Sequence, residues 1–358
     1  MKKYDICILG GGASGMAAAA SLSERFKICI VEKNKILGRK LMATGGGRCN
    51  ITNEACRNKD VTVDFFNSLG LELYADEEGR YYPYSNHAAD VSYALERGIG
   101  KRQVHVYTGF CVEKVEKADD VFKISNGEKI ICSDVLILSC GGKAAPFFGT
   151  TGDGYKFAKA LGHSVNKVYP ILTGIDCAGL EALKGIRAKG RISLYKNGRM
   201  VDAETGEIQF TGTGISGICV MNLTLFIKAD DGEDIRSAVK KYEISMDLAP
   251  DFTEDMIAER KDSFGILCRK LSEKVPVSRI KDYRVKVTGV KGWKDAQCTA
   301  GGVPQYEIDT DTMESKITPN LYITGELLDI QGKCGGFNLQ NAWETAIRAA
   351  AHINGEIK

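Results

Sequence analysis

A glycine-rich turn near the N-terminus places the strongest constraint on how this 358-residue chain can fold. The apolar run from Tyr4 to Leu9 leads into residues 10–15, Gly-Gly-Gly-Ala-Ser-Gly, which match the pattern G-x-G-x-x-G. The alanine-rich segment 16–20 is typical of a helix, and a second apolar run, 28–31, ends in Glu32. A strand, a helix, a strand and an acid in this order predict a βαβ unit that binds a dinucleotide.

Each residue of this unit has a physical task in dinucleotide binding. Gly10 permits a tight turn, Gly12 lets the backbone approach a pyrophosphate, and Gly15 lets the helix lie close to the sheet. The start of the helix, with Ala13 and Ser14, presents N–H groups and the positive end of the helix dipole to the phosphates. Glu32 is placed to accept hydrogen bonds from a ribose, which favours FAD or NAD over NADP.

A second match to the same pattern lies at Gly212 to Gly217. Only twelve residues separate Gly217 from the next acid in a comparable position, Asp230, and these are too few for a helix and a following strand. We therefore interpret the second match as a strand-to-helix turn. It gives no support for a separate NAD(P)H domain.

Composition and charge exclude several classes of protein. The 48 Lys and Arg against 46 Asp and Glu leave a net charge of +2, which argues against a dedicated nucleic-acid binder. The longest apolar run, 218–227, is interrupted by Asn222 and Thr224 and is too short to span a bilayer, and the N-terminus does not match a signal peptide. The twelve cysteines include no C-x-x-C pair and no zinc-type spacing. We expect no metal, no membrane partner and a reducing, cytoplasmic location.

The rest of the chain predicts a discontinuous domain with an insertion. Short alternating runs between residues 104 and 131 predict a β-meander, which leads to a buried parallel strand at 135–138. Segment 321–329 again has the pattern of a strand and a turn, and a long helix follows to the C-terminus. We predict an α/β fold with a Rossmann-like domain, residues 1–162 and 316–358. A β-rich substrate domain, residues 163–315, is inserted, with a short helical insert at about 250–282.

Several blocks, in order over nearly the whole chain, resemble the BaiN- and YhiN-like flavoproteins, also called the aminoacetone oxidase family of FAD-binding enzymes. The blocks are 10–15, 38–41, 46–50, 79–80 with Pro83, 151–154, 210–217, 299–303, 313–316, 325–329 and 335–340. The resemblance implies a noncovalent FAD in a Rossmann-like FAD-binding domain made from both chain ends. It also implies oxidoreductase activity, and BaiN-like members point to reduction of an unsaturated oxo-steroid of the bile-acid type.

Two features depart from that family. Gly212 and Thr213 stand where the family commonly has a His-Tyr pair, and the middle of the chain is shorter than usual. Both features fall in the predicted substrate domain.

Further candidates for cofactor binding follow the predicted strands or lie in glycine-rich loops. Loop 38–53 offers backbone N–H groups and cations to a phosphate or an electron-rich ring. Gly335 and Gly336 open the last helix, whose N-terminus favours the negative charge that a reduced flavin carries near N1. Asp329 would accept hydrogen bonds from hydroxyls of the cofactor. Besides the βαβ unit, the candidates are Lys33, Arg39, Lys40, Thr44, Gly46, Gly47, Val112, Cys140, Gly141, Gly142, Gly325, Glu326, Asp329, Gly335, Gly336, Asn338 and Leu339.

We predict an FAD-dependent oxidoreductase that transfers hydride through flavin N5 to or from a small organic substrate. No catalytic acid or base is assigned, because His87, near Tyr81, Tyr82 and Tyr84, fits a packing role as well as proton transfer. NAD(P)H stays open as a transient electron donor, and the oligomeric state is not predicted. Two alternatives also stay open: an FAD-dependent RNA-modifying transferase, which would need a basic surface, and a flavin-binding module without turnover.

Overall fold

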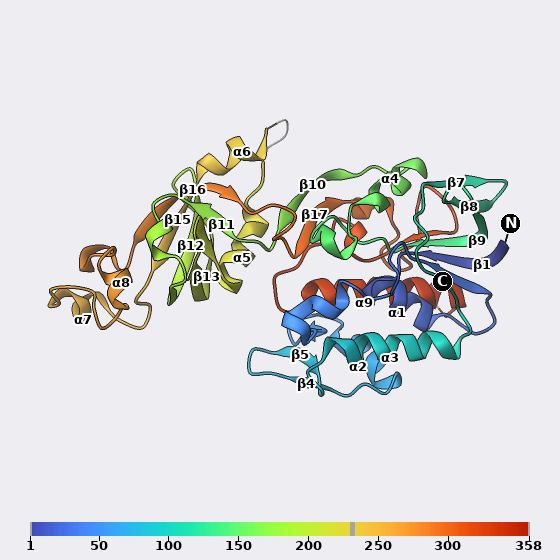
Figure 1. Cartoon of the computed structure of the whole chain (residues 1–358), viewed down its shortest axis with the longest axis horizontal. Coiled ribbons are helices and arrows are strands. Elements are labelled where there is room, and N and C mark those ends of the chain that lie inside the picture. The colour runs from blue at the N-terminus through green and yellow to red at the C-terminus, as the bar shows by residue number, and fades with distance from the viewer. Residues whose placement is uncertain (1, 230–232, 357–358) are drawn as a thin grey trace. The chain divides into compact units, whose positions relative to one another are not determined.

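The computed structural model describes residues 2–229 and 233–356, and the chain divides into two compact units (Figure 1). The first unit comprises residues 1–169 and 298–358, and the second comprises residues 170–297. Each unit has its own cluster of buried apolar side chains. The second unit is therefore an insertion into the first.

The boundaries of this insertion differ from the predicted 163–315. In the structure, β10 (Asn166–Ile171) pairs with β17 (Cys298–Gly302) in a two-stranded sheet. The buried His163 ring also binds Glu307 and Ser315, at 2.7 and 2.8 Å. These contacts join both flanks of the insertion to the first unit.

The first unit is built on a mixed sheet with the strand order β6-β2-β1-β9-β8-β7 and β18 added beside β9. Five strands are parallel, and β2 and β18 consist entirely of buried apolar or aromatic residues, as is typical of a parallel sheet. The strands are β1 (Lys2–Leu9), β2 (Ile28–Val31), β6 (His105–Tyr107), β7 (Lys114–Ala118), β8 (Val121–Ser125), β9 (Ile130–Leu138) and β18 (Leu321–Ile323).

Helices cover this sheet. Helix α1 packs on α9, and α3 packs on α1 (Figure 1). Small side chains make the first contact close, because α1 buries four successive alanines, 17–20, and α9 buries Ala346, Ala349 and Ala350. The helices are α1 (Ala13–Ser21), α2 (Lys59–Ser68), α3 (Ala88–Lys101), α4 (Asp153–Ala160) and α9 (Phe337–Asn354). A small sheet beside them has the order β3 (Thr52–Asn53), β5 (Arg80–Pro83), β4 (Leu73–Ala75).

The Rossmann-like α/β fold predicted from the sequence is confirmed, with one correction to the meander. The Asn126-Gly127 turn joins β8 to β9, and residues 135–138 end the parallel strand β9. His105–Tyr107 does not belong to the meander, however, since it pairs in parallel with β2 at the opposite edge of the sheet. A three-residue run carries too little pattern to indicate its partner, and the crossover through α3 decides the pairing.

The second unit is a closed barrel with the strand order β11-β14-β13-β12-β15-β16. Its strands are β11 (Ile175–Cys177), β12 (Arg187–Lys196), β13 (Arg199–Phe210), β14 (Gly214–Ser216), β15 (Tyr242–Asp247) and β16 (Tyr283–Val290). Its helices are α5 (Ile218–Leu223), α6 (Ile235–Ala238), α7 (Glu254–Ala258) and α8 (Arg269–Ser272). The second glycine motif forms the turn between β13 and β14 and the start of α5, which confirms that it is not a second βαβ unit.

Segment 250–282 was predicted as a helical insert. In the structure it holds the short helices α7 and α8 and a single 3-10 turn, Val277–Arg279. The helices of the described residues include none that is both long enough and apolar enough to cross a bilayer.

Candidate cofactor-binding site

The carboxyl ends of four parallel strands meet at one edge of the sheet in the first unit. Leu9, which ends β1, pairs with Val31 at the end of β2 and with Leu138 at the end of β9. Leu138 in turn pairs with Ile323 at the end of β18. Most of the predicted cofactor residues follow one of these ends: 10–15, 32–33, 140–142 and 325–326. Doubly wound sheets bind their ligands at this edge.

The glycines after β1 shape the turn and leave space beside it. Gly10 has φ +111°, and a Cβ on it would lie 2.4 Å from the Ser139 carbonyl oxygen. A Cβ on Gly15 would lie 1.9 Å from the Gly10 carbonyl oxygen, so only glycine lets α1 pack this closely. A Cβ on Gly12 would meet no atom within 4 Å. Backbone atoms thus pack directly against Gly10 and Gly15, whereas the space beside Gly12 is free of protein atoms.

The N-terminus of α1 lies at this open position. No side chain caps the helix, and its first turn contains no acid. The Ser14 hydroxyl donates to Thr324 Oγ1 at 2.7 Å, so this side chain ties α1 to the end of β18, while Ala13 packs against the core. The backbone N–H groups of the first turn are therefore the donors that α1 can offer to a phosphate.

The Glu32 carboxylate is buried and faces the glycine turn. Its Oε2 accepts from the Gly11 N–H at 2.8 Å, and its Oε1 accepts from the backbone N–H and the side-chain amide of Asn34, both at 2.7 Å. A carboxylate has about four acceptor positions, so Glu32 keeps capacity for a ribose hydroxyl. Arg39 lies at the same place, since its guanidinium donates to Asn34 Oδ1 at 3.1 Å.

Lys33, which follows Glu32, forms its contacts with residues at the start of α4. Its ammonium contacts Asp153 and donates to Thr151 Oγ1 at 2.6 Å. Burial raises the pKa of the Asp153 carboxyl, but hydrogen bonds from Lys33 and Thr151 outweigh this effect and hold the pKa below its ordinary value. The charge of Lys33 is therefore already neutralised within the chain.

Loop 38–53 contains the second open stretch of backbone. It forms a 3-10 segment, Leu41–Gly47, that is interrupted at residues 44–46. Gly46 and Gly47 have positive φ, and a Cβ on either would meet no atom within 4 Å. The Thr44 hydroxyl donates to the Leu41 carbonyl at 2.6 Å, which stabilises the interruption. The Arg48 guanidinium lies 4.7 Å from the centre of the buried Tyr82 ring.

A partly buried ion pair joins two of the loops at this edge to strand β17. Lys40 Nζ lies 2.9 Å from Glu326 Oε2, and Glu326 Oε1 accepts from the Thr299 N–H at 2.8 Å. Burial disfavours the Lys40 charge, but the attraction of Glu326 outweighs it, and the pKa of the ammonium lies above its ordinary value. Lys40 and Glu326, both predicted to bind the cofactor, thus contact one another at this edge, and their contact with the cofactor stays a prediction.

The residues after β9 pack against this pair. A Cβ on Gly142 would lie 2.3 Å from Thr299 Oγ1 and 2.6 Å from Glu326 Oε1. The Cys140 thiol donates to the Leu9 carbonyl at 3.3 Å, and burial raises its pKa to about 12. Gly141 between them has φ +68°. Val112 packs against the core two residues after Phe110, whose N–H donates to the Glu32 carbonyl at 3.0 Å.

After β18, the chain turns through Gly325, whose N–H donates to Thr345 Oγ1 of α9 at 2.9 Å. The Asp329 carboxylate further on accepts from Asn166 Nδ2 at 2.7 Å and from the Gln331 amide. Both of its oxygens therefore have a donor within the chain.

Asparagine side chains hold the loop that leads into α9. Asn338 donates to the Gly332 carbonyl and accepts from the Gly332 N–H, both at 2.9 Å. Asn53 Nδ2 donates to the Gly335 carbonyl at 2.9 Å. A Cβ on Gly336 would lie 2.4 Å from the Thr52 carbonyl oxygen, which requires glycine there. The Leu339 side chain packs against the core, so the backbone of loop 332–336 is the part that a cofactor can reach.

Sequence reasoning missed the residues that hold the site in shape: Asn34, Asn53 and Thr299. Asn53 and Thr299 have partners that lie far along the chain, and the Asn34 amide bridges the nearby Glu32 and the distant Phe148 carbonyl, so no spacing pattern connects the three residues. No catalytic acid or base was assigned from the sequence, and none is assigned here. His87 is exposed at the start of α3, and the Tyr81 hydroxyl donates to Glu54 at 2.7 Å.

The residues at this edge fit an FAD. The backbone is open at Gly12, Gly46 and Gly47, where a phosphate or a ring can approach, and a helix N-terminus and a buried acid lie beside the first of these positions. The fold and this edge define an FAD-dependent oxidoreductase with a Rossmann-like domain.

Comparison with known families agrees with this class. The model of the HI0933-like protein Rossmann domain matches residues 56–352, and that of the NAD(P)-binding Rossmann-like domain matches residues 8–43. The chain belongs to the HI0933-like family, which confirms the resemblance to BaiN- and YhiN-like flavoproteins.

Three relatives match almost the whole chain. A 3-dehydro-bile acid delta(4,6)-reductase of Clostridium scindens is 32% identical over 410 aligned positions, which cover 97% of this chain and 98% of the relative. The ribosomal RNA dihydrouridine synthase of Escherichia coli is 25% identical, over 99% of this chain and 98% of its own. The ribosomal RNA dihydrouridine synthase of Haemophilus influenzae is 27% identical, and the match covers 97% of this chain and 98% of that relative.

Among solved structures, the 3-ketosteroid delta1-dehydrogenase of Sterolibacterium denitrificans matches with a TM-score of 0.55. The two proteins are 12% identical, and the match covers 100% of each chain. At this identity the similarity concerns the fold alone.

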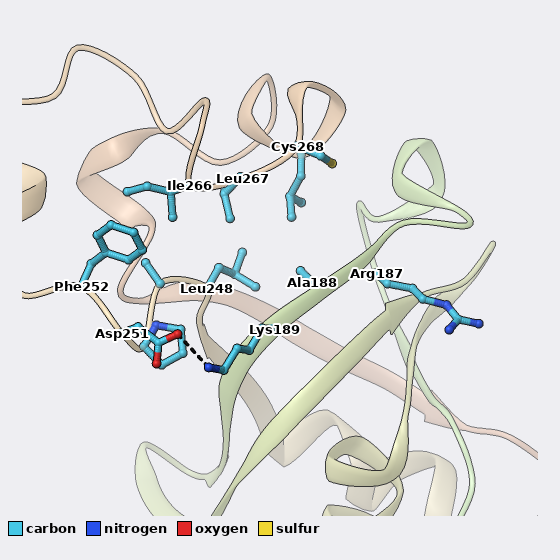
Figure 2. Close-up of a pocket in the computed structure, with 12 residues that line it drawn as sticks. Arg187, Ala188, Lys189, Leu248, Asp251, Phe252, Ile266, Leu267 and Cys268 are labelled. Carbon is cyan, nitrogen blue, oxygen red and sulfur yellow. Dashed lines mark hydrogen bonds and ion pairs between the residues drawn. The ribbon is translucent and has the colours of Figure 1, made fainter.

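The barrel unit contains a pocket of about 230 Å³ that involves none of these residues (Figure 2). Figure 2 shows Ile266 and Leu267 pointing toward Leu248. The two cations at the pocket are paired: Lys189 with Asp251 at 2.8 Å and Arg187 with Glu207 at 3.3 Å. The lining is Arg187, Ala188, Lys189, Leu248, Ala249, Pro250, Asp251, Phe252, Ile266, Leu267, Cys268 and Leu271.

Proposed function

We propose that this chain is an FAD-dependent reductase of a carbon–carbon double bond conjugated to a carbonyl group, and that its substrate is an oxo-steroid of the bile-acid type. The observation that carries the proposal is the 32% identity, over nearly the full length of both proteins, to a 3-dehydro-bile acid delta(4,6)-reductase. The Rossmann-like unit with its open glycine backbone supports the use of FAD.

The proposal assigns the cofactor-binding roles as follows. The N–H groups at the start of α1 bind the pyrophosphate, and Glu32 accepts from the adenosine ribose. The backbone of loop 332–336 and the start of α9 donate to the flavin ring system where negative charge develops on reduction. Lys40 and Glu326 hold two loops and strand β17 in place around it. Bound FAD supplies two-electron hydride chemistry at N5.

A second candidate function is reduction of uridine in ribosomal RNA, since two relatives are ribosomal RNA dihydrouridine synthases. The two reactions share their chemistry, because the uracil double bond is also conjugated to a carbonyl. The lower identity and the net charge of +2 favour the steroid, since RNA binding depends on a basic surface.

The test begins with the absorption spectrum of the purified protein and chromatography of the chromophore released by acid. We expect free FAD in a ratio close to one per chain. Under anaerobic conditions, a dihydronicotinamide and a 3-oxo-4,6-diene bile acid should then give a product that is two hydrogens heavier. A protein that binds no FAD contradicts the cofactor assignment. Turnover of unmodified ribosomal RNA, with none of the steroid, would replace the first candidate by the second.

A further inference from the structure

Two large apolar residues at the carboxyl edge of the sheet in the first unit are more than half exposed. Ile36 is 53% exposed and lies in the loop that follows β2 and Glu32. Phe147 is 55% exposed and lies in the loop between β9 and α4. A single exposed apolar residue is ordinary, but two on neighbouring loops of a ligand site form a surface of the kind that ligands cover.

Contacts of the Asn34 side chain hold these two loops together beside Glu32. The Asn34 amide donates to Glu32 Oε1 at 2.7 Å and to the Phe148 carbonyl at 3.2 Å. A Cβ on Gly149 would lie 2.6 Å from Asn34 Nδ2, so the second loop packs directly on this side chain. One amide group therefore bridges the carboxylate of Glu32 and the loop that carries Phe147.

The loop that carries Phe147 has a defined shape. Residues 146–148 form a single 3-10 turn, and Ala145 before it and Gly149 after it are both left-handed, with φ 55° and 95°. The Phe148 N–H donates to the Ala145 carbonyl at 3.0 Å. The Phe147 and Phe148 rings pack against one another, with centroids 4.4 Å apart. The turn and the neighbouring ring thus support Phe147, although more than half of its surface is open to solvent.

The covalent structure of FAD places its adenine next to Glu32. The proposed function assigns Glu32 to a hydroxyl of the adenosine ribose. Adenine is bonded to the ribose carbon next to the one that carries the 2′-hydroxyl, so the base lies beside the residue that holds this hydroxyl. The flat faces of a base stack on aromatic side chains and pack against apolar ones. Phe147 and Ile36 offer such side chains on the two loops that meet at Glu32.

We propose that Phe147 stacks on the adenine of FAD and that Ile36 packs against the same base. The inference rests on the proposed function, whose cofactor is FAD. Stacking of this kind adds to the affinity for the adenosine half of the cofactor and leaves the affinity for the flavin half unchanged. The two side chains therefore contribute to the preference of this chain for FAD over a flavin that has no adenine.

The test compares Phe147→Ala with Phe147→Tyr, and uses Tyr93→Ala as the matched control. Tyr93 is an aromatic residue of α3 that is 63% exposed and lies outside the assigned site. Loss of the stacking ring in Phe147→Ala should raise the dissociation constant of FAD by about tenfold. Phe147→Tyr keeps an aromatic ring and should bind FAD as the wild type does, and so should Tyr93→Ala. The melting temperature of the apoprotein should stay unchanged in all three variants, because both positions are exposed.

Adenosine diphosphate gives a second readout that involves neither a flavin nor turnover. This ligand has the adenine, the ribose and the pyrophosphate of FAD, and the ultraviolet absorbance of adenine falls when the base stacks on an aromatic ring. The wild-type apoprotein should bind it with such a fall, and Phe147→Ala should bind it about tenfold more weakly with a smaller fall. Ile36→Ala should weaken binding to a smaller extent, and it tests the same subsite if Phe147→Ala folds poorly.

The outcomes separate this inference from the proposed function. If the wild type binds FAD and Phe147→Ala binds FAD and adenosine diphosphate equally tightly, the role of Phe147 is overturned and the proposed function stands. Adenosine diphosphate that binds the wild type with no change in absorbance also overturns the stacking. If the wild type binds neither ligand, the cofactor assignment of the proposed function fails, and the inference fails with it.

Discussion

At the scale of single residues, the glycines at the cofactor edge have two different roles, one in the packing of the chain and one in leaving space for a ligand. Gly10, Gly15 and Gly336 are required by the chain itself, because a Cβ at any of them would lie within 2.4 Å of a backbone oxygen. Gly12, Gly46 and Gly47 have open space instead. The first group serves folding, and the second leaves room for a ligand.

This difference predicts opposite results for two alanine substitutions. Gly12 has φ −84°, which alanine adopts readily, so Gly12→Ala should keep the melting temperature of the apoprotein. Its methyl group enters the cofactor space, and the dissociation constant of FAD should rise at least tenfold. Gly15→Ala should lower the melting temperature or prevent folding. Differential scanning calorimetry and fluorescence titration with FAD measure both quantities. Equal FAD affinity in Gly12→Ala and the wild type would contradict the proposal that the cofactor binds beside Gly12.

The Lys40–Glu326 pair gives a second prediction. Lys40→Met leaves the Glu326 carboxylate partly buried beside the Thr299 N–H without its cation, and the free energy of unfolding should fall by about 1–3 kcal/mol. The double variant Lys40→Met/Glu326→Gln should recover part of this loss. Urea unfolding of the wild type, the single variants Lys40→Met and Glu326→Gln and the double variant forms a double-mutant cycle, and strictly additive effects would show that the pair has no coupling.

At the scale of elements, the close contact of α1 with α9 joins the two ends of the chain. Alanines make this contact possible, and the Ser14 and Thr345 hydroxyls connect the helices to the end of β18 and to Gly325. The asparagine contacts of loop 332–336 fix the start of α9 in the same way. The C-terminal segment is thus a structural part of the cofactor edge.

The close contact of these helices predicts that a larger side chain lowers the free energy of unfolding at some positions of α9 and not at others. Ala346 of α9 is fully buried, and Ala346→Leu should lower the free energy of unfolding by about 1–3 kcal/mol through overpacking. Ala351→Leu, five residues further along α9 at a half-buried position, is the control and should change the free energy of unfolding by less than about 0.5 kcal/mol. Chemical denaturation checks both, and equal effects would argue against a tight helix contact.

The buried His163–Glu307 contact predicts a pH dependence. Burial raises the pKa of the Glu307 carboxyl, but hydrogen bonds from Ser164 and His163 outweigh this effect, and the pKa lies below its ordinary value. A lowered native pKa contributes stability above the ordinary value of about 4.3 and loses it as the pH falls through the native value. The stability difference between the wild type and Glu307→Gln should therefore be largest at neutral pH and shrink below about pH 4. A constant difference from pH 7 to pH 3 would contradict the assignment.

At the scale of the whole molecule, two separate cores and one cofactor edge predict separate responses to FAD. Calorimetry should resolve two unfolding transitions, since the units have different apolar clusters. FAD at 100 times its dissociation constant should stabilise only the transition of the first unit, by about 2.7 kcal/mol. The Gly12→Ala variant at the same FAD concentration is the control and should show a smaller shift. One transition that FAD shifts as a whole would show that the two units unfold together.

The amino-acid sequence by itself determined the βαβ unit, the parallel sheet, the inserted β-rich unit and the family, because glycine positions, apolar runs and their spacing are local properties. It also indicated the loops at the carboxyl edge. It could not place His105–Tyr107 in the sheet, and it did not indicate that Lys40 and Glu326, both predicted to bind the cofactor, form an ion pair with one another. Tertiary structure decided these points, because each depends on side chains whose partners lie tens or hundreds of residues away, and only the pairing of strands brings them within hydrogen-bond distance.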